Sequence, residues 1–269
     1  MLDFPEPDVP STAMTRLGRS RIPRVDDSPV IFSPVSHVDN TLRDSTPVER
    51  PSLVIAVDGT SGSGKSSTSR GVADRLGLRY LDTGAMFRAM TWWLLREGID
   101  VRDPAAVAAA SGRPVIESGT DPLAPTITVD GVDVSVEIRG DDVNAAVSPV
   151  SAVPQVRTRL LELQREVIGA GGIVVEGRDI GSVVWPQAEL KVYLSADPDA
   201  RAQRRTAEQG GTDVASTQQS LLERDRIDSG RATAPLTMAE GAVHVDSTHL
   251  SLSEVIERIV GLAAEADGA

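Results

Sequence analysis

The stretch VIAVDGTSGSGKSSTSRGVADRL, residues 54–76, decides the fold of this chain. Residues 53–57 form a continuous apolar run, which is typical of a strand buried on both faces of a sheet. Residues 59–66, GTSGSGKS, match the pattern G-x-x-x-x-G-K-[ST] in full. Residues 64–76 then favour a helix. Strand, glycine-rich turn and helix in this order predict a P-loop, a backbone cradle for the phosphates of a nucleoside triphosphate.

Each residue type in this loop serves that chemistry. Glycines let successive N–H groups point inward at phosphate oxygens. Lys65 can reach the β- and γ-phosphates, and the Ser66 hydroxyl can ligate Mg²⁺. Glu176 or Asp58 is a candidate for a second contact with the ion through water. The candidate triphosphate-binding residues are Gly59, Thr60, Ser61, Gly62, Ser63, Gly64, Lys65, Ser66 and Ser67.

Composition and charge narrow the class of protein. The chain has 269 residues with a net charge of -12, which disfavours general binding to nucleic acid or to an anionic membrane. It contains no cysteine, so disulfides and thiolate metal sites are excluded. Lys65 and Lys191 are its only lysines. We expect a cytoplasmic protein that is a monomer and has no membrane partner.

The organisation along the chain indicates an α/β fold. Residues 1–50 are interrupted by prolines and predict a disordered N-terminal extension. From residue 51 to 269, strand patterns alternate with helix patterns, as in a mainly parallel sheet flanked by helices. The expected strands are 53–57, 79–81, 172–176, 190–194 and 242–246; the expected helices are 64–76, 85–96, 104–110, a helix starting at Ser148-Pro149, helices within 197–229, and a last helix capped by Ser251 and Glu254.

One segment departs from this alternation. Between about 113 and 147, the runs RPVIE, TITVD and DVSVE alternate apolar and polar residues and are separated by turn residues, including Asp130-Gly131. This pattern predicts a small β-rich insertion. Downstream, the region of about 210–232 is rich in arginine.

A P-loop alone leaves GTPases, ABC-type ATPases and small-molecule kinases open. A GTPase needs an N-K-x-D motif, but Asn40 and Asn144 are followed by Thr and Ala. The ABC signature L-S-G-G-Q is absent. Arginines on several separate elements favour a second anionic substrate. The stretches that carry them are YLDTGAMFR (80–88), NAAVSPVSAVPQVR (144–157), VEGRDIGS (175–182) and ERDRIDSGRATAPL (223–236).

From about residue 53 onward, the chain closely resembles the bacterial cytidylate (CMP/dCMP) kinases. The stretches that carry the resemblance are DGTSGSGKSS, LDTGAMFR, GVDVSVEIR, EGRDIGSVVWP, ERDRIDSGRATAPL and VDST. Phe87 stands where the family usually has Tyr, Thr60 replaces a common Pro, and Glu176 stands where Asp is also found. The resemblance implies a P-loop nucleoside monophosphate kinase fold, with the β-rich insertion on the monophosphate side and an Arg-rich lid at 210–232.

The resemblance also implies roles for the arginine stretches. The γ-phosphoryl group of Mg·ATP would move to CMP or dCMP. Arg88 and Arg178 would grip the acceptor phosphate, and Arg224 and Arg231 would come down with the lid, helped by Asp228. Asp179 would accept from the cytosine amino group, and Arg157 would donate to its carbonyl. The implied catalytic residues are Lys65, Arg178, Arg224 and Arg231; the implied CMP-binding residues are Asp82, Thr83, Arg88, Ser148, Arg157, Arg178, Asp179, Asp228 and Arg231.

Two other functions stay open at this point. A kinase for another monophosphate, such as UMP, would differ in its contact at Asp179. A non-catalytic P-loop module, in which the nucleotide switches a partner interaction, would bind nucleotide without phosphoryl transfer.

Overall fold

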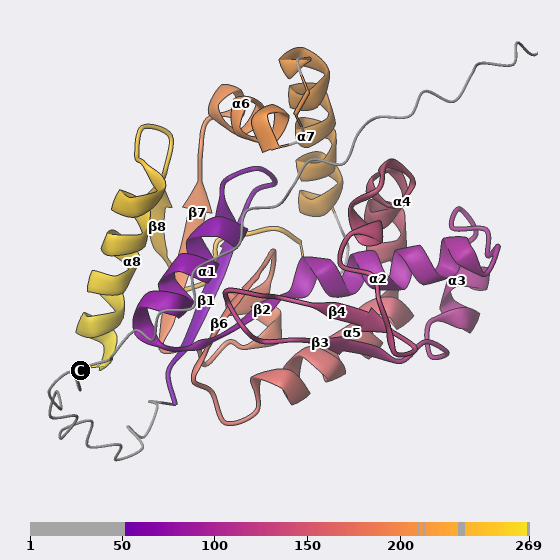
Figure 1. Cartoon of the computed structure of the whole chain (residues 1–269), viewed down its shortest axis with the longest axis horizontal. Coiled ribbons are helices and arrows are strands. Elements are labelled where there is room, and N and C mark those ends of the chain that lie inside the picture. The colour runs from indigo at the N-terminus through magenta and orange to yellow at the C-terminus, as the bar shows by residue number, and fades with distance from the viewer. Residues whose placement is uncertain (1–51, 209, 212, 231–234, 268–269) are drawn as a thin grey trace, which may run out of the picture. The chain divides into compact units, whose positions relative to one another are not determined.

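A computed structural model describes residues 52–208, 210–211, 213–230 and 235–267 (Figure 1). The expected extension at 1–50 and part of the expected lid, including Arg231, lie outside the described residues. Strands are β1 Val54–Gly59, β2 Arg79–Asp82, β3 Ile116–Ser118, β4 Ile127–Val129, β5 Val132–Asp133, β6 Ile173–Gly177, β7 Leu190–Ser195 and β8 Val243–Asp246. Helices are α1 Lys65–Leu76, α2 Thr83–Arg96, α3 Pro104–Ala110, α4 Asp141–Ser151, α5 Pro154–Ile168, α6 Pro198–Glu208, α7 Val214–Ser229 and α8 Leu252–Asp267.

The core is a five-stranded sheet of order β2-β6-β1-β7-β8 in which every neighbouring pair is parallel. β1 lies at its centre and is buried along its whole length. Alternate residues of β1 enter two separate hydrophobic clusters, one on each face of the sheet. Helices α1 and α8 cover one face, and α2 and α5 cover the other. The predicted parallel α/β core is confirmed.

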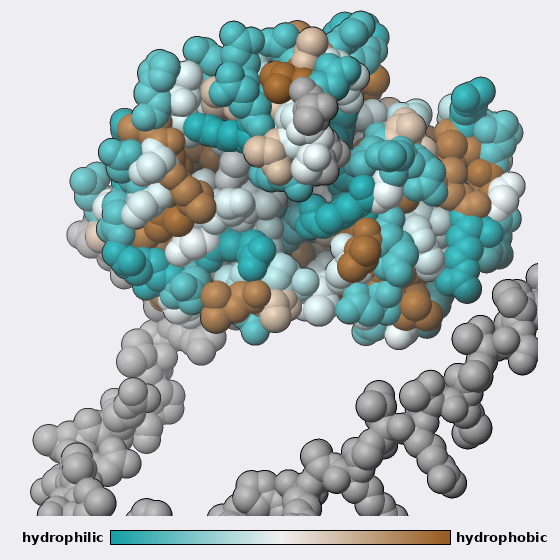
Figure 2. Space-filling model, turned by 45° about the horizontal axis from the view of Figure 1, so that its top comes forward, coloured by the Kyte–Doolittle hydropathy of each residue, from teal (hydrophilic) through white to brown (hydrophobic). Residues whose placement is uncertain are grey.

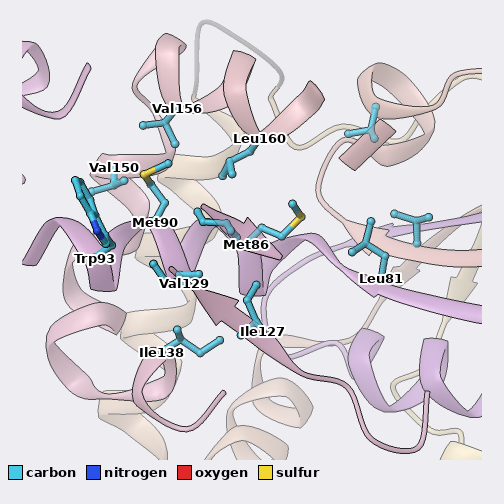
Figure 3. Packing of buried hydrophobic residues seen from close by; sticks show 14 of the residues in the cluster. Leu81, Met86, Met90, Trp93, Ile127, Val129, Ile138, Val150, Val156 and Leu160 are labelled. Atoms are coloured by element: carbon cyan, nitrogen blue, oxygen red, sulfur yellow. The ribbon is translucent and has the colours of Figure 1, made fainter. Parts of the chain in front are cut away.

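The β-rich insertion forms a three-stranded antiparallel sheet, β3-β4-β5. Asp130 and Gly131 both have positive φ, 51° and 78°, which gives the predicted tight turn between β4 and β5. Figure 3 shows how the insertion is attached: Ile127 and Val129 pack with Met86, Met90 and Trp93 of α2. This apolar contact brings the insertion beside the helix that follows β2.

Two expectations for this region are wrong. The run DVSVE is not a strand beyond Asp133, because the Asp133 carboxylate accepts from the backbone N–H and the hydroxyl of Ser135 and ends the extended chain. A short 3₁₀ helix, Glu137–Arg139, follows. The insertion is also helical from Asp141 onward, since α4 buries Val143, Ala146, Val147 and Val150 on one side.

The helix expected to start at Ser148-Pro149 does not start there. Both residues lie inside α4, and α5 begins at Pro154 after Val153, which has no capping side chain. The burial of the apolar side of α4 against α2 outweighs the preference of Pro for a first turn. The capping box of α8 is confirmed: Glu254 N–H donates to Ser251 Oγ at 3.3 Å, and Ser251 N–H donates to Glu254 Oε2 at 2.8 Å.

Candidate active site

The P-loop joins β1 to α1 with its backbone held open. Gly62 and Gly64 have φ values of 76° and 88°, in the left-handed region that glycine tolerates. Gly59 packs so closely on β7 that a Cβ there would lie 2.0 Å from the Leu194 carbonyl oxygen. α1 begins at Lys65 with no capping side chain and no acidic residue in its first turn. Its first amides are therefore available to an anion.

Lys65 is buried at the base of this loop. Its ammonium donates to the Thr60 carbonyl at 2.6 Å. Burial, and next the charge of Arg178, lower the pKa of Lys65 to about 7. An incoming polyphosphate would add negative charge beside Lys65 and favour its ammonium form.

A cavity of about 520 Å³ opens beside the loop. Figure 2 shows a hollow in the surface of the molecule, with hydrophilic side chains around it. The P-loop residues that line the cavity are Ser61, Gly62, Gly64, Lys65, Ser66 and Ser67. Three other loop residues do not line the cavity: Gly59, Thr60 and Ser63. They support the loop, because the Thr60 carbonyl accepts from the Lys65 ammonium and from the Ser63 hydroxyl.

Glu176 is the penultimate residue of the neighbouring strand β6 and lines the same cavity. Its Oε1 accepts from the Tyr80 hydroxyl at 2.6 Å, whereas Oε2 is buried and has no hydrogen-bond partner among the described residues. Burial, and next the carboxylate of Asp82, raise the pKa of Glu176 to about 7. Lys65 and Ser66 are its polar neighbours on α1. A buried carboxylate with a serine hydroxyl as its neighbour is a donor set that suits Mg²⁺.

Asp58, the other carboxylate considered for this role, is used differently. Its two oxygens accept from the backbone N–H groups of Ile180 and Gly181, at 2.7 and 2.8 Å. Burial raises its pKa to about 6. Asp58 does not line the cavity, and its carboxylate holds the π-helical turn Ile180–Val184 against β1. Of the two candidates, Glu176 therefore has the better position for the ion.

Arginines from three elements meet in the cavity. Arg88 of α2 donates to Asn144 Oδ1 at 2.7 Å, and Arg178 after β6 pairs with Asp228 Oδ2 at 2.9 Å. Arg224 of α7 lines the cavity too, and Asp82 borders it while capping α2. Burial, and next Arg224, lower the pKa of Arg88 to about 9, whereas burial and Arg178 lower that of Arg224 to about 10. Such crowded cations are the environment of a bound anion.

Another part of the cavity wall holds one ion pair next to an aromatic ring. Asp179 Oδ2 and Arg157 Nη2 lie 2.5 Å apart, and the Phe87 ring lies 5.5 Å from the Arg157 guanidinium. Thr83 and Ser148 line the same cavity, and the Thr83 hydroxyl donates to the Glu176 carbonyl at 2.7 Å. The carboxylate and the guanidinium offer one acceptor and a set of donors side by side.

The structure adds residues that the sequence analysis missed. Arg70, Arg139 and Arg205 also line the cavity. The positive charges of Arg205 and Arg139 contribute to the lowered pKa of Arg88. Asp225 and Arg201 clasp the P-loop: Ser61 N–H donates to Asp225 Oδ1 at 3.0 Å, and Arg201 donates to the Ser61 carbonyl at 2.9 Å. The helical period of residues 223–230 is a signal that could have identified the positions facing the cavity. It would have set apart Arg226, which is exposed and pairs with Glu223.

The comparisons with known proteins agree with this geometry. The sequence model described as cytidylate kinase matches residues 55–265. The chain belongs to the cytidylate kinase family. It is 57% identical to the cytidylate kinase of Streptomyces avermitilis over 217 residues, which cover 80% of this chain and 94% of that protein. It is 58% identical to that of Streptomyces coelicolor, with the same coverage, and 45% identical to that of Mycobacterium leprae over 81% of this chain and 98% of the relative.

Proposed function

We propose that this member of the cytidylate kinase family transfers the γ-phosphoryl group of Mg·ATP to CMP or dCMP, which yields ADP and CDP or dCDP. The observation that carries the proposal is that one cavity is lined by the P-loop, by the Arg157–Asp179 pair and by several further arginines. A donor polyphosphate, an acceptor phosphate and a nucleobase edge each have a matching set of side chains in it.

The reaction needs positioning more than proton transfer. A phosphate oxygen of the acceptor attacks the γ-phosphorus, and the bond from that phosphorus to the bridging oxygen of the β-phosphate breaks. The acceptor oxygen is already anionic, so it requires no general base. Lys65 and the α1 amides hold the donor phosphates, while Arg88 and Arg178 hold the acceptor. Arg224 neutralises charge on the transferred group, and Arg231 is proposed to do so with it.

A magnesium ion fits the residues present. Ser66 would hold it, and Glu176 would do so through water, because its Oε2 is buried without a partner among the described residues. The ion would neutralise charge on the β- and γ-phosphates when bound. The chain's own part is to keep a carboxylate and a hydroxyl at the phosphate end of the cavity.

Base choice follows from Asp179 and Arg157. Cytosine presents an amino group and a carbonyl, so it can donate to the carboxylate and accept from the guanidinium. Uracil presents a carbonyl in place of the amino group, which would leave Asp179 facing a second acceptor. A site built for a specific polar edge rejects such an analogue strongly. Asp228 is proposed to hold Arg178 or the sugar, and Thr83 and Ser148 to complete the base site.

Within the part of the chain that the structure describes, no helix is long and apolar enough to cross a membrane. We propose a cytoplasmic enzyme that acts as a monomer, and sedimentation of the full chain tests the second point.

ADP release by the full chain from Mg·ATP tests the proposal, with CMP, dCMP, UMP and AMP as separate acceptors. Turnover with CMP and dCMP well above that with UMP and AMP is expected. Preference for UMP would indicate another monophosphate kinase. Nucleotide binding with no transfer to any acceptor would indicate a nucleotide-switched binding module. A chain starting at residue 51 tests whether the extension is dispensable for the reaction.

A further inference from the structure

Tyr80 carries a buried hydroxyl that the proposed reaction does not use. It lies on β2 and is 2% exposed, within the apolar layer that also contains Val72 of α1 and Val174 of β6. Its hydroxyl donates to Glu176 Oε1 at 2.6 Å. A phenolic O–H in an apolar layer needs a polar partner. Here that partner is the carboxylate proposed to serve the magnesium ion.

Strand register sets this contact. β2 and β6 are parallel, with Tyr80 opposite Val174 and Asp82 opposite Glu176. Tyr80 and Glu176 are thus two positions apart on the same face, a gap that a tyrosine can span. Phenylalanine would fill the same space and donate nothing.

The contact leaves the two Glu176 oxygens in different states. Oε1 is taken by Tyr80, while Oε2 is buried and makes no hydrogen bond within the described residues. Ser66 and Lys65 are the neighbours of this carboxyl group on α1. The backbone of Glu176 is fixed as well, because its carbonyl accepts from the Thr83 hydroxyl at 2.7 Å. A carboxylate held at one oxygen cannot turn freely, so its other oxygen keeps one direction.

We propose that Tyr80 is a positioning residue for the magnesium ion: its hydroxyl holds Glu176 Oε1 so that Oε2 stays directed at the Ser66 end of the cavity. This inference rests on the proposed function, in which Mg·ATP is the donor. Partners that orient a metal-binding carboxylate are commonly worth about 10-fold in metal affinity. Tyr80 therefore acts on the ion through Glu176 and touches no substrate.

The alternative is that Tyr80 only fills the sheet face. The two roles differ in one measurement, the affinity for ATP with and without Mg²⁺. If Tyr80 only fills the sheet face, Tyr80→Phe leaves both affinities unchanged, because phenylalanine fills the same space. A general disturbance of the P-loop would instead change both affinities together. A positioning role changes only the affinity gained from the ion.

The experiment is isothermal titration of ATP into the full chain, once with excess Mg²⁺ and once with EDTA, for wild type and Tyr80→Phe. We expect Tyr80→Phe to lose about 10-fold of the Mg²⁺-dependent gain in affinity, with metal-free affinity unchanged. Thr91→Val is the control. It removes another fully buried hydroxyl, which donates to the Phe87 carbonyl, and should leave the gain intact.

Glu176→Gln provides the second variant. With this carboxylate neutralised, adding Tyr80→Phe should have no further effect on the gain. Equal loss of both affinities, or no loss, in Tyr80→Phe would overturn the positioning role. No gain from Mg²⁺ in the wild type would overturn the proposed ion site itself, so the two failures are distinguishable.

Discussion

Arg157 Nη2 donates to Asp179 Oδ2 at 2.5 Å, and both side chains are about nine-tenths shielded, with exposures of 10% and 8%. This is a desolvated pair in the wall of the cavity that the P-loop also lines. A buried pair of this kind contributes little net stability, because desolvation offsets most of the attraction. In the proposed function this pair offers an acceptor and donors side by side to the edge of the base.

Asp179→Asn should change base choice. An amide can donate where the carboxylate only accepts, so cytosine loses its match and uracil no longer meets a second acceptor. We expect kcat/KM for CMP to fall about 100-fold and the CMP/UMP preference to narrow. Steady-state rates with both acceptors measure this. The exposed Asp74, changed to Asn, serves as the control, and an unchanged preference in Asp179→Asn would remove Asp179 from the base site.

Asn144→Ala should weaken the binding of the phosphoryl acceptor CMP and leave the binding of the donor ATP unchanged. Asn144 Oδ1 accepts from Arg88 at 2.7 Å, and its Nδ2 donates to the Arg139 carbonyl at 2.9 Å, so it holds Arg88 in place from α4. Loss of that charged hydrogen bond should raise KM for CMP about 10-fold, with KM for ATP unchanged. Varying one substrate at a time separates the two. A matched rise in both values would contradict the assignment.

Asp225→Ala should loosen the P-loop and destabilise the fold. Asp225 pairs with Arg201, which is buried at 4% exposure, and accepts from Ser61 N–H at 3.0 Å. Removing one partner leaves the Arg201 cation unpaired, at a cost of about 3 kcal/mol. Urea unfolding measures the loss. Arg226→Ala, which breaks an exposed pair in the same helix, should change nothing measurable.

Binding of metal-free ATP should take up a proton at alkaline pH. Burial and Arg178 lower the pKa of Lys65 to about 7 in the free protein, so at pH 8 it is mostly neutral. The triphosphate favours the ammonium and draws that pKa back up. Affinity should therefore fall as pH rises above about 7, with uptake of close to one proton at pH 8. Titration in buffers of different ionisation enthalpy detects it. Lys65→Met should show none.

Local sequence was enough to predict the elements that are specified by a short run of residues. Residues 53–57 are apolar throughout because β1 is buried on both faces, and the loop pattern needs glycine at positive φ. Ser251 and Glu254 satisfy one another across a single turn. These signals lie within a few residues, so they could be recognised without the fold.

Two sequence patterns were outweighed by contacts that the patterns do not contain. Pro149 looked like the start of a helix, yet it lies inside α4 because Val143, Val147 and Val150 bury their side of that helix. The run DVSVE alternates like a strand, yet Val136 is 80% exposed because Asp133 turns the chain at Ser135. In both cases a contact with another part of the chain, or a local side-chain bond, outweighed the pattern.

The sequence by itself determined the P-loop, the parallel core and the set of arginines and carboxylates, because those depend on residue type and short spacing. Only the tertiary structure decided which of them act together. It directed Asp58 to the amides of Ile180 and Gly181, brought the Glu176 carboxyl group near Ser66, and joined Tyr80 to Glu176 across 96 residues. The reason is strand order: β6 lies between β1 and β2, so residues far apart in the chain share one sheet edge.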